Sequence, residues 1–470
     1  LKKYGIYVDN MQKMNIATLK ASVDELLHHI LHNYLLIVAK CDQCCKHSVS
    51  TVKPCNIMIT PRCHAIKQLL ITLPHQRCLC LDMLHRAVHT RSFLRTKHLM
   101  TNHADTISHQ FNRLVILIHN LKAGTINIIG LKKEVDVDVD EGSDKIMEAI
   151  SSIQEIDDIQ GETGKNVGNM LNKVRRVMAG LTNKSPQDIK IQDLLAVDTF
   201  NPQKVVGGIA DEFALENAVG IAAMVKSDRL QMEMIAQVLT EKLRVPVYVG
   251  GVEADMAIKG ALTTPGTSVP LAIVDMGAGS TDASIINREG KVKLIHLAGA
   301  GNMVSLLIQS ELGLDDFELA EDVKKYTLAK VESLFHIRHE NGTVQFFDKP
   351  LDPSIFAKVV LVKENDELVP LDGVESLEKV KAVRMEAKKK VFVTNAIRSL
   401  SKVSPTGNPR DIQFVVMVGG SALDFEIPNF VTDALADYEI VAGRGNIRGC
   451  EGPRNAVATG LAMACVEQEN

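Results

Sequence analysis

Pro270-Leu-Ala-Ile-Val-Asp-Met-Gly-Ala-Gly-Ser-Thr-Asp-Ala-Ser-Ile-Ile-Asn287 is the most informative stretch of the sequence. Apolar runs at 271–274 and 283–286 flank a short glycine-rich segment, a pattern that predicts a strand, a glycine loop and a second strand. A turn at 287–290 then leads to a third predicted strand at 291–298. Walker loops and dinucleotide-binding loops open a helix instead. The stretch therefore predicts antiparallel strands joined by a glycine loop.

The chemistry of this loop suits phosphate binding. Gly277 and Gly279 allow the backbone to approach an anion and to direct N–H groups at its oxygens. Ser280 and Thr281 add hydroxyl donors. Two flanking carboxylates are placed to hold a hydrated Mg²⁺ between phosphate and protein, namely Asp275 and Asp282. The structural alternative is an ordinary hairpin with a glycine turn.

Composition divides the chain near residue 120. The 470 residues allow two to four domains, and neither a membrane-spanning run nor a signal peptide is evident. Residues 1–120 carry 15 Lys+Arg against 6 Asp+Glu, a net charge of +9, whereas the whole chain carries -4. The same segment holds 12 of 15 His and 7 of 9 Cys but one Gly. We therefore predict an atypical segment at 1–120, followed by regions at 121–268 and 269–470.

The first segment does not point to a known activity. Cys41-x2-Cys44 has zinc-knuckle spacing, but no second pair follows at a matching interval, so we do not predict a zinc site. Its basic residues are scattered and form no nucleic-acid-binding motif. We expect that 1–120 is not a native domain of the family described below and that it arose from a frameshifted or misjoined gene start.

Residues 121–268 predict a mixed α/β region. We expect strands at 132–140 and 245–252, and helices at 142–153, 166–181, 216–224, 228–243 and 253–262. The apolar stripe of the helix at 166–181 is interpreted as core. Four acidic residues are interpreted as solvated or capping groups rather than catalytic ones: Asp193, Asp198, Glu212 and Glu216.

The following segment, to residue 403, predicts further helices. A Gly-Ala-Gly turn at 299–301 offers a second set of backbone donors and leads into a helix at 303–312. A helix at 319–335 carries Glu321 and Lys324 at i, i+3, a spacing typical of a surface ion pair. A long basic helix is expected at 379–403, with its charges on a solvated face.

The last segment contains a second informative motif. A buried strand at 414–418 ends in Gly419-Gly420-Ser421, which permits a flat nucleoside to lie against the backbone. A helix at 427–438 follows, and then a glycine-rich loop at 441–454. In that loop Arg448 and Arg454 are candidates for binding phosphate or stacking on adenine, with a flexible surface turn as the alternative. A small-residue helix is expected at 455–465.

The order of these motifs resembles the second lobe of actin and of the heat-shock ATPase chaperones. Several stretches also resemble the large subunit of diol/glycerol dehydratase-reactivating factors: Asp193-Leu-Leu-Ala-Val-Asp-Thr199, Met224-Val-Lys-Ser-Asp-Arg-Leu-Gln-Met232, Ala261-Leu-Thr-Thr-Pro-Gly-Thr267, Lys330-Val-Glu-Ser-Leu-Phe335 and Gly445 to Gly460. The resemblance covers about residues 121–470. It implies an α/β fold whose 269–470 lobe is an actin-like (ribonuclease H-like) ATPase lobe with additional α+β segments.

The resemblance further implies an ATP-dependent, chaperone-like factor that releases damaged cobalamin from an adenosylcobalamin-dependent diol or glycerol dehydratase. It implies ATP/ADP and Mg²⁺ as ligands, a hetero-oligomer with a small subunit, and the dehydratase as client, without nucleic acid or membrane. The implied location is the cytoplasm, with a bacterial microcompartment as the alternative. By position, phosphates would lie at Gly277 to Thr281, with Asp275 on the metal side through water. The nucleoside would be bordered by Glu321, Asp322, Lys324, Gly420, Ser421 and Arg454.

One departure from the family and two alternative functions remain. The family's first phosphate loop is of the Gly-Ile-Asp-x-Gly-Asn-Ser type. Gly5-Ile-Tyr-Val-Asp-Asn10 places Tyr7 at the metal-side Asp and Asp9 at the phosphate-facing Gly. An acid there would repel phosphate, so we assign no catalytic residue and leave ATP hydrolysis open. The alternatives are a small-molecule kinase of the same fold and a non-enzymatic actin-like scaffold.

Overall fold

The computed structural model describes residues 115–119, 123–182, 184–204, 213–225, 249–374 and 376–469, with seven single residues between 233 and 247. The chain divides into two compact units. The first comprises Leu1–Asn112, Gly180–Asn183 and Asp228–Val249, and the second Arg113–Ala179, Lys184–Ser227 and Gly250–Asn470. The helices and strands described below belong to the second unit, except for the last three residues of the helix that ends at Thr182. The predictions for residues 1–114 lie outside the described residues, and the predicted three-part division of the chain stays a prediction.

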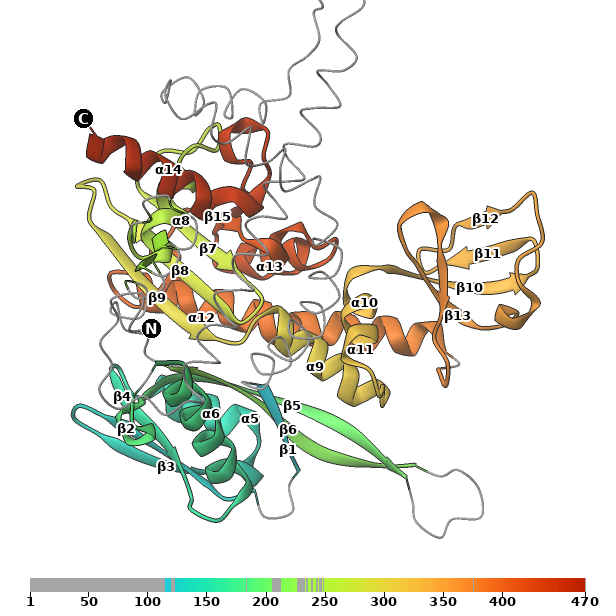
Figure 1. Cartoon of the computed structure of the whole chain (residues 1–470), viewed down its shortest axis with the longest axis horizontal. Helices are drawn as coiled ribbons and strands as arrows, with labels where there is room; N and C mark the ends of the chain where they lie inside the picture. The colour runs from blue at the N-terminus through green and yellow to red at the C-terminus, as the bar shows by residue number, and fades with distance from the viewer. Residues whose placement is uncertain are drawn as a thin grey trace, which may run out of the picture. The chain divides into compact units, whose positions relative to one another are not determined.

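The C-terminal lobe is built on a five-stranded sheet of order β16-β15-β7-β8-β9 (Figure 1). Its antiparallel part is β7 (Leu271–Met276), β8 (Ser280–Ile286) and β9 (Val292–Ala298). Two parallel strands then extend it beyond β7, namely β15 (Phe414–Val418) and β16 (Val441–Arg444). The predicted hairpin, third strand and Gly-Gly strand are thus confirmed, as is the α/β fold class. The prediction of an irregular loop over 441–454 was wrong at its start, where β16 forms.

Both faces of the central strands β7 and β15 are buried, which explains why these two strands read as continuous apolar runs. Leu271 and Ile273 face α8 (Glu253–Ala261) and the start of α14 (Ala456–Glu469). Ala272 and Val274 belong to a larger core on the opposite face. The helices contributing to that core are α9 (Gly301–Leu312), α12 (Thr394–Val403) and α13 (Ile427–Ala436). The helices predicted at 253–262, 303–312, 427–438 and 455–465 are confirmed.

A second five-stranded sheet is inserted between α10 (Phe317–Lys325) and α11 (Leu377–Lys388) (Figure 1). It is antiparallel, of order β12-β11-β10-β13-β14, with β10 Thr327–Ser333, β11 His336–His339, β12 Val344–Phe346, β13 Val359–Val362 and β14 Leu368–Pro370. The single helix predicted at 319–335 was therefore wrong in its second half. The helix ends at Lys325 because residues from Thr327 onward pair with both β11 and β13.

The long helix predicted at 379–403 is confirmed as one continuous rod. It runs through α11, a π-helical turn η7 (Lys389–Val393) and α12. Its charges do not all lie on a solvated face, because Arg384 and Lys388 have no exposed surface. They lie on the same stripe as the buried Val380 and Val391, which explains why they enter the interior.

Residues 123–182 form a smaller α/β layer. The strands β2 (Thr125–Gly130), β3 (Glu134–Asp138) and β4 (Ile156–Gly161) form a sheet of order β3-β2-β4, which packs with α5 (Ser143–Ser151) and α6 (Asn166–Thr182) around one apolar core. The strand predicted at 132–140 and both helices are confirmed. In α6 the predicted stripe is core: its most buried members are Val167, Met170, Leu171 and Val174.

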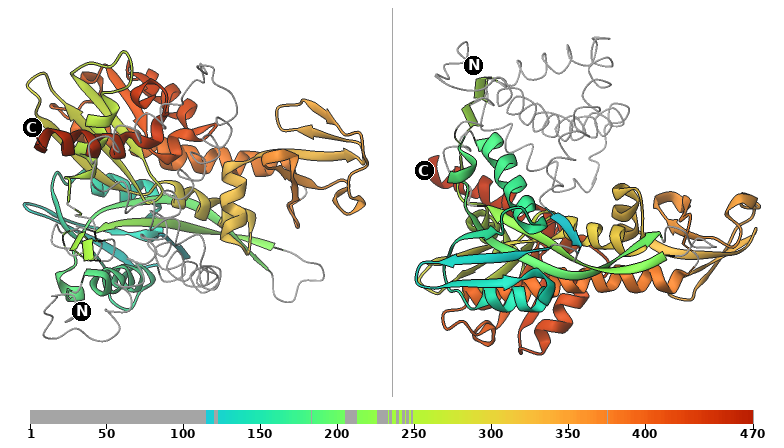
Figure 2. Two further views of the ribbon diagram at one scale, coloured as in Figure 1. Left: turned by 45° about the horizontal axis from the view of Figure 1, so that its top comes forward. Right: turned by 90° about the horizontal axis from the view of Figure 1, so that it is seen from below.

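A long two-stranded ribbon follows, which Figure 2 shows in two views. It consists of β5 (Ile191–Lys204) and β6 (Phe213–Val225), and β1 (Val115–His119) pairs with β6 on its other side. The helix predicted at 216–224 was wrong. Ala, Glu and Met favour helices, but β6 pairs with β5 from Phe213 to Val225, and this pairing overrides local propensity.

Two further predictions concern residues 228–252. The helix predicted at 228–243 falls largely outside the described residues. The described residues of 245–252 are not in a strand, contrary to the prediction.

Among the described residues, no helix has the length and apolar character needed to cross a membrane. The remaining elements are short 3-10 turns: η3 Val139–Glu141, η4 Pro186–Asp188, η5 Pro353–Ile355, η6 Glu364–Asp366, η8 Pro409–Asp411, η9 Gly420–Leu423, η10 Ile447–Gly449 and η11 Pro453–Asn455.

Candidate functional site

The first component of the candidate site is the glycine loop between β7 and β8. The Gly277 N–H donates to the Ser280 carbonyl at 3.1 Å, which closes the loop tightly. The Thr281 side chain is buried, and its hydroxyl donates to the Gly299 carbonyl at 2.9 Å. The sequence suggested Thr281 as a hydroxyl donor to phosphate. In the structure this hydroxyl is instead used to support the neighbouring turn. The Ser280 hydroxyl lies 3.4 Å from a carboxylate oxygen of Asp282.

The second component is the turn Gly299–Gly301, which follows β9. Backbone N–H groups of this turn, and that of the following Asn302, donate hydrogen bonds to the carbonyls of the glycine loop. Gly299 donates to Gly279 at 3.2 Å, Gly301 to Gly277 at 3.3 Å and Asn302 to Ala278 at 2.8 Å. Within the described part of the chain, the N–H groups of Ala278 and Gly279 donate to no acceptor. The second turn therefore holds the glycine loop through the carbonyls of the loop, and two N–H groups of the loop remain available to an anion.

The third component is the turn Gly419–Ser421 at the end of β15. The Ser421 hydroxyl donates to the Gly277 carbonyl at 3.0 Å. Gly419 has a φ of 91°, and a Cβ there would lie 2.3 Å from an Asp275 carboxylate oxygen and 2.6 Å from the Met276 carbonyl. Only glycine fits at this point. A Cβ on Gly420, in contrast, would meet nothing within 4 Å. The three turns, which are far apart in sequence, thus contact one another directly.

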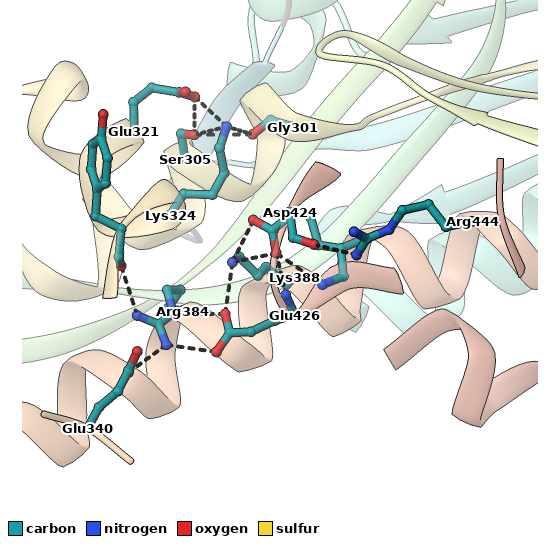
Figure 3. A network of polar contacts seen from close by, with 12 residues as sticks. Gly301, Ser305, Glu321, Lys324, Glu340, Arg384, Lys388, Asp424, Glu426 and Arg444 are labelled. Carbon is teal, nitrogen blue, oxygen red and sulfur yellow. Dashed lines mark hydrogen bonds and ion pairs between the residues drawn. The ribbon is translucent and has the colours of Figure 1, made fainter. Parts of the chain in front are cut away.

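Helix α10 adds charged side chains beside the second turn (Figure 3). The Lys324 ammonium group donates to the Gly301 carbonyl at 2.9 Å, to the Ser305 hydroxyl at 2.8 Å and to Glu321 at 2.5 Å. Glu321 and Lys324 side chains are only 13% and 11% exposed, so the surface ion pair expected from spacing alone is a buried one. Burial opposes ionisation of Glu321, but the Lys324 charge and the hydrogen bonds from Lys324 and Ser305 outweigh it and lower the pKa of this carboxyl.

The remaining nucleoside-side candidates have different surroundings. Asp322 forms an ion pair with Lys363 at 2.5 Å, beside the inserted sheet. Arg454 is exposed in η11, directly after Pro453, whose carbonyl accepts a hydrogen bond from the Gly419 N–H at 3.1 Å. The structure therefore brings Arg454 next to the third turn, whereas Arg448 interacts with Glu451 at 3.6 Å.

A row of titratable side chains lies beneath the glycine loop. Asp275, Asp282 and His296 are direct cross-strand partners on β7, β8 and β9. Burial, followed by repulsion from Asp282 and Glu253, raises the pKa of Asp275 to about 7. The adjacent Asp282 carboxylate raises the pKa of His296. Asp282 is 5% exposed, and its Oδ1 has no hydrogen-bond donor although His296 Nδ1 lies 3.2 Å away.

These carboxylates do not form a complete metal cage. Among the described residues, no group of three or more His, Cys, Asp or Glu side chains could hold a metal ion. Mg²⁺, however, usually keeps several waters and binds through one or two carboxylates together with substrate phosphates. Asp275 and Asp282 beneath the loop fit that kind of hydrated, phosphate-bridged ion.

Sequence reasoning missed two groups of buried polar residues behind these turns. The first comprises Arg384, Lys388, Asp424 and Glu426, drawn in Figure 3. The second comprises Asp193, which accepts from the Ala298 N–H at 2.9 Å and pairs with Arg398 at 2.8 Å, so Asp193 is not a solvated carboxylate. The available signal was position: Arg384 and Lys388 lie on an apolar stripe, and Asp193 immediately precedes an apolar run.

The other carboxylates kept their expected roles where they are described. Asp198 accepts from the Ser143 N–H at 2.8 Å, at the start of α5, and Glu216 is exposed. Glu212 lies outside the described residues.

Comparisons with known proteins agree with this architecture. The model of the family described as the diol dehydratase reactivase ATPase-like domain matches residues 137–465. The propanediol dehydratase-reactivating factor large subunit of Citrobacter freundii is 62% identical over 344 residues, which cover 73% of this chain and 56% of that protein. The diol dehydratase-reactivating factor large subunit of Klebsiella michiganensis has the same identity and coverage.

A solved structure described as glycerol dehydratase reactivase gives the same result in three dimensions. It is 61% identical, with a TM-score of 0.69, and the match covers 74% of this chain and 57% of that one. The chain thus spans a little more than half the length of the relatives that it matches. Because the family match extends over most of the chain, from the smaller α/β layer to α14, this chain belongs to the diol dehydratase reactivase ATPase-like domain family.

Proposed function

We propose that the three turns bind one adenine nucleotide, and that this binding serves the ATP-dependent reactivation of an adenosylcobalamin-dependent diol or glycerol dehydratase. The observation that carries the proposal is the direct contact between turns from three separate parts of the lobe. Gly301 donates its N–H, and Ser421 its hydroxyl, to the same Gly277 carbonyl. Where the three turns meet, the N–H groups of Ala278 and Gly279 lie in the glycine loop, and the third turn contributes Gly420, around which there is open space.

Phosphate groups would bind at the Ala278 and Gly279 N–H groups, with the Ser280 hydroxyl beside them. Backbone donors in such a concave turn hold anions through several hydrogen bonds at once. The nucleoside would lie between α10, with Glu321, Asp322 and Lys324, and the Gly420–Ser421 backbone. Arg454 would cover the exposed side, since it is free to stack on a planar base.

A hydrated Mg²⁺ would be held from below by Asp275 through water. When bound, it supplies positive charge that neutralises the phosphate oxygens. On the adjacent strands, Asp282 adds a second carboxylate to this row, and His296 lies beside Asp282, where its protonated ring would offset part of the negative charge.

The reactivation itself would require partners. The relatives are large subunits of dehydratase-reactivating factors, so we propose a hetero-oligomer with a small subunit and a diol or glycerol dehydratase as client. Nucleotide binding would drive the release of damaged cobalamin, so that intact coenzyme can enter. We propose that the protein acts in the cytoplasm, where a bacterial microcompartment is the alternative location.

The binding step is tested with ADP and the full chain. Gly420→Asp places a carboxylate on the open face of the third turn. A Cβ at this position would meet no other atom within 4 Å, so we expect the variant to fold. We expect ADP affinity, measured by calorimetry, to fall by at least about tenfold, equivalent to about 1.4 kcal/mol. Gly443→Asp is the matched control, because Gly443 on β16 also has open space around it. Equal ADP affinity in all three proteins would contradict the site assignment.

The biological step is tested by adding the small subunit, ATP, Mg²⁺ and inactivated dehydratase. Recovered dehydratase turnover supports the reactivase function. Phosphorylated glycerol would instead indicate a kinase, and nucleotide-dependent sedimentation without turnover would indicate a scaffold.

A further inference from the structure

Helix α11 carries two cations that are completely buried. Arg384 and Lys388 are one helical turn apart on the same face, and neither has exposed surface. Basic side chains are almost never fully buried unless they are paired, because removing a charge from water is costly. Their partners therefore decide what this part of the helix does.

Arg384 connects three elements (Figure 3). Its Nε and Nη2 atoms donate to the two carboxylate oxygens of Glu426 at 2.9 and 2.7 Å. Nη2 also donates to Glu340, which follows β11, at 2.7 Å. Nη1 donates to the Tyr326 carbonyl at 3.3 Å. Because Tyr326 is the residue that ends α10, the guanidinium group holds the end of the helix that bears Glu321 and Lys324.

Lys388 extends this network to the third turn. Its ammonium group contacts Asp424 and Glu426, both at 2.8 Å. The Asp424 carboxylate also accepts the backbone N–H groups of Glu426 and Ile427, at 2.8 and 3.0 Å, at the start of α13. Asp424 directly follows η9, which begins at Gly420. Lys388 thus anchors the C-terminal end of the turn whose Gly420 and Ser421 form the other side of the proposed nucleoside site.

We propose that Arg384 and Lys388 are positioning residues that fix the separation between α10 and the Gly419–Ser421 turn, and thereby the width of the nucleoside site. This inference rests on the proposed nucleotide function. The guanidinium fork has a fixed planar geometry, so it defines where Glu426 lies relative to Tyr326. Few other arrangements are available to the network, because each would leave a buried charge without a partner. A nucleoside that binds between α10 and the Gly419–Ser421 turn would therefore find these two elements already held at a fixed separation.

The decisive experiment compares two buried arginines. Arg384→Lys keeps the positive charge but cannot reach Glu340, Glu426 and the Tyr326 carbonyl together. Arg175→Lys is the matched control. Arg175 is buried in the smaller α/β layer, where it bonds Asp158 at 2.8 Å and the Ile159 carbonyl at 2.7 Å, and also the Ile189 carbonyl. We expect both variants to lower the Tm, and only Arg384→Lys to weaken ADP binding, by about tenfold.

Calorimetric titration with ADP is performed at a temperature at which circular dichroism shows all proteins folded. If Arg384→Lys binds ADP within about twofold of the unmodified protein, the positioning role is wrong. The same holds if Arg175→Lys weakens ADP binding equally at a similar loss of Tm. Should Arg384→Lys not fold, Glu426→Gln, which keeps the shape but weakens both ion pairs, decides in its place by the same criteria. Absence of ADP binding by the unmodified protein would overturn the proposed function itself, which is a separate result.

Discussion

The smaller α/β layer and the C-terminal lobe both use glycine where backbones approach closely, but the surroundings differ. In the layer, a Cβ on Gly168 would lie 2.0 Å from the Glu162 carbonyl oxygen, so glycine lets α6 begin against the end of β4. In the lobe, Gly419 is equally tight, yet the next residue, Gly420, has open space. A close approach alone therefore indicates packing. A close approach followed by an open glycine indicates a backbone that is held in place for contact with something else.

The largest expected effect tests this contrast within one turn. Gly419→Ala would force a Cβ against Asp275 and the Met276 carbonyl at a positive φ, so we expect a loss of about 3 kcal/mol or more in the free energy of unfolding. Gly420→Ala should change it by less than about 1 kcal/mol. Urea unfolding of both variants measures the difference. Similar losses in both would show that the two glycines are not distinct, and the comparison would fail.

A smaller, pH-dependent effect is expected from Asp275. Its pKa is about 7 in the folded protein, above the ordinary value of 3.8, so the folded state binds the extra proton between these pH values. The resulting stabilisation is full below the unfolded pKa and is lost as pH rises through about 7. Asp275→Asn removes this loss. Relative to the unmodified protein, the variant should gain stability between pH 5 and pH 8, on the order of a few kcal/mol.

Urea unfolding at both pH values provides the measurement for Asp275→Asn. Asp348→Asn, at an exposed carboxylate shortly after β12, serves as the control for the substitution itself. A constant difference between Asp275→Asn and the unmodified protein across this range would contradict the assigned shift.

The smallest expected effect concerns the bond between the first and third turns. Ser421→Ala removes the hydroxyl that donates to the Gly277 carbonyl, which should cost about 1 kcal/mol of stability and weaken ADP binding a few-fold. Ser401→Ala removes a comparable hydroxyl-to-carbonyl bond, to Ile397 within α12, and should leave ADP binding unchanged. Thermal unfolding and ADP titration distinguish the two. Equal ADP affinities would mean that the bond between the turns is structural only.

Local sequence patterns predicted the parts of the fold that local physics determines. The strands around 277–279 and the strand before Gly419 were predictable because apolar runs and glycines occur in a fixed order. Helix α6 was predictable from its stripe. The family resemblance then predicted which of the glycine turns lie close together, and the structure brings these turns into contact.

Features that depend on distant partners were not predictable. Strand β6 contains helix-favouring residues and becomes a strand because β5 pairs with it. The inserted sheet was missed because β10 continues directly from α10 without a glycine or proline between them. The burial of Arg384 depends on Glu340 and Glu426, which come from other elements, and no local pattern indicates these partners.

The π-helical turn between α11 and α12 fixes the relative direction of two side-chain anchors, one on each side of it. Lys388 before the turn reaches the Gly419–Ser421 side, while Asn395 after it donates to the Ala298 and Gly299 carbonyls at 2.8 and 2.7 Å. Each residue of a helix advances the side-chain direction by about 100°. Deleting one residue between these positions would swing one anchor away from its target while the other stayed. In this chain the length of the segment between Lys388 and Asn395 is therefore constrained by both anchors at once.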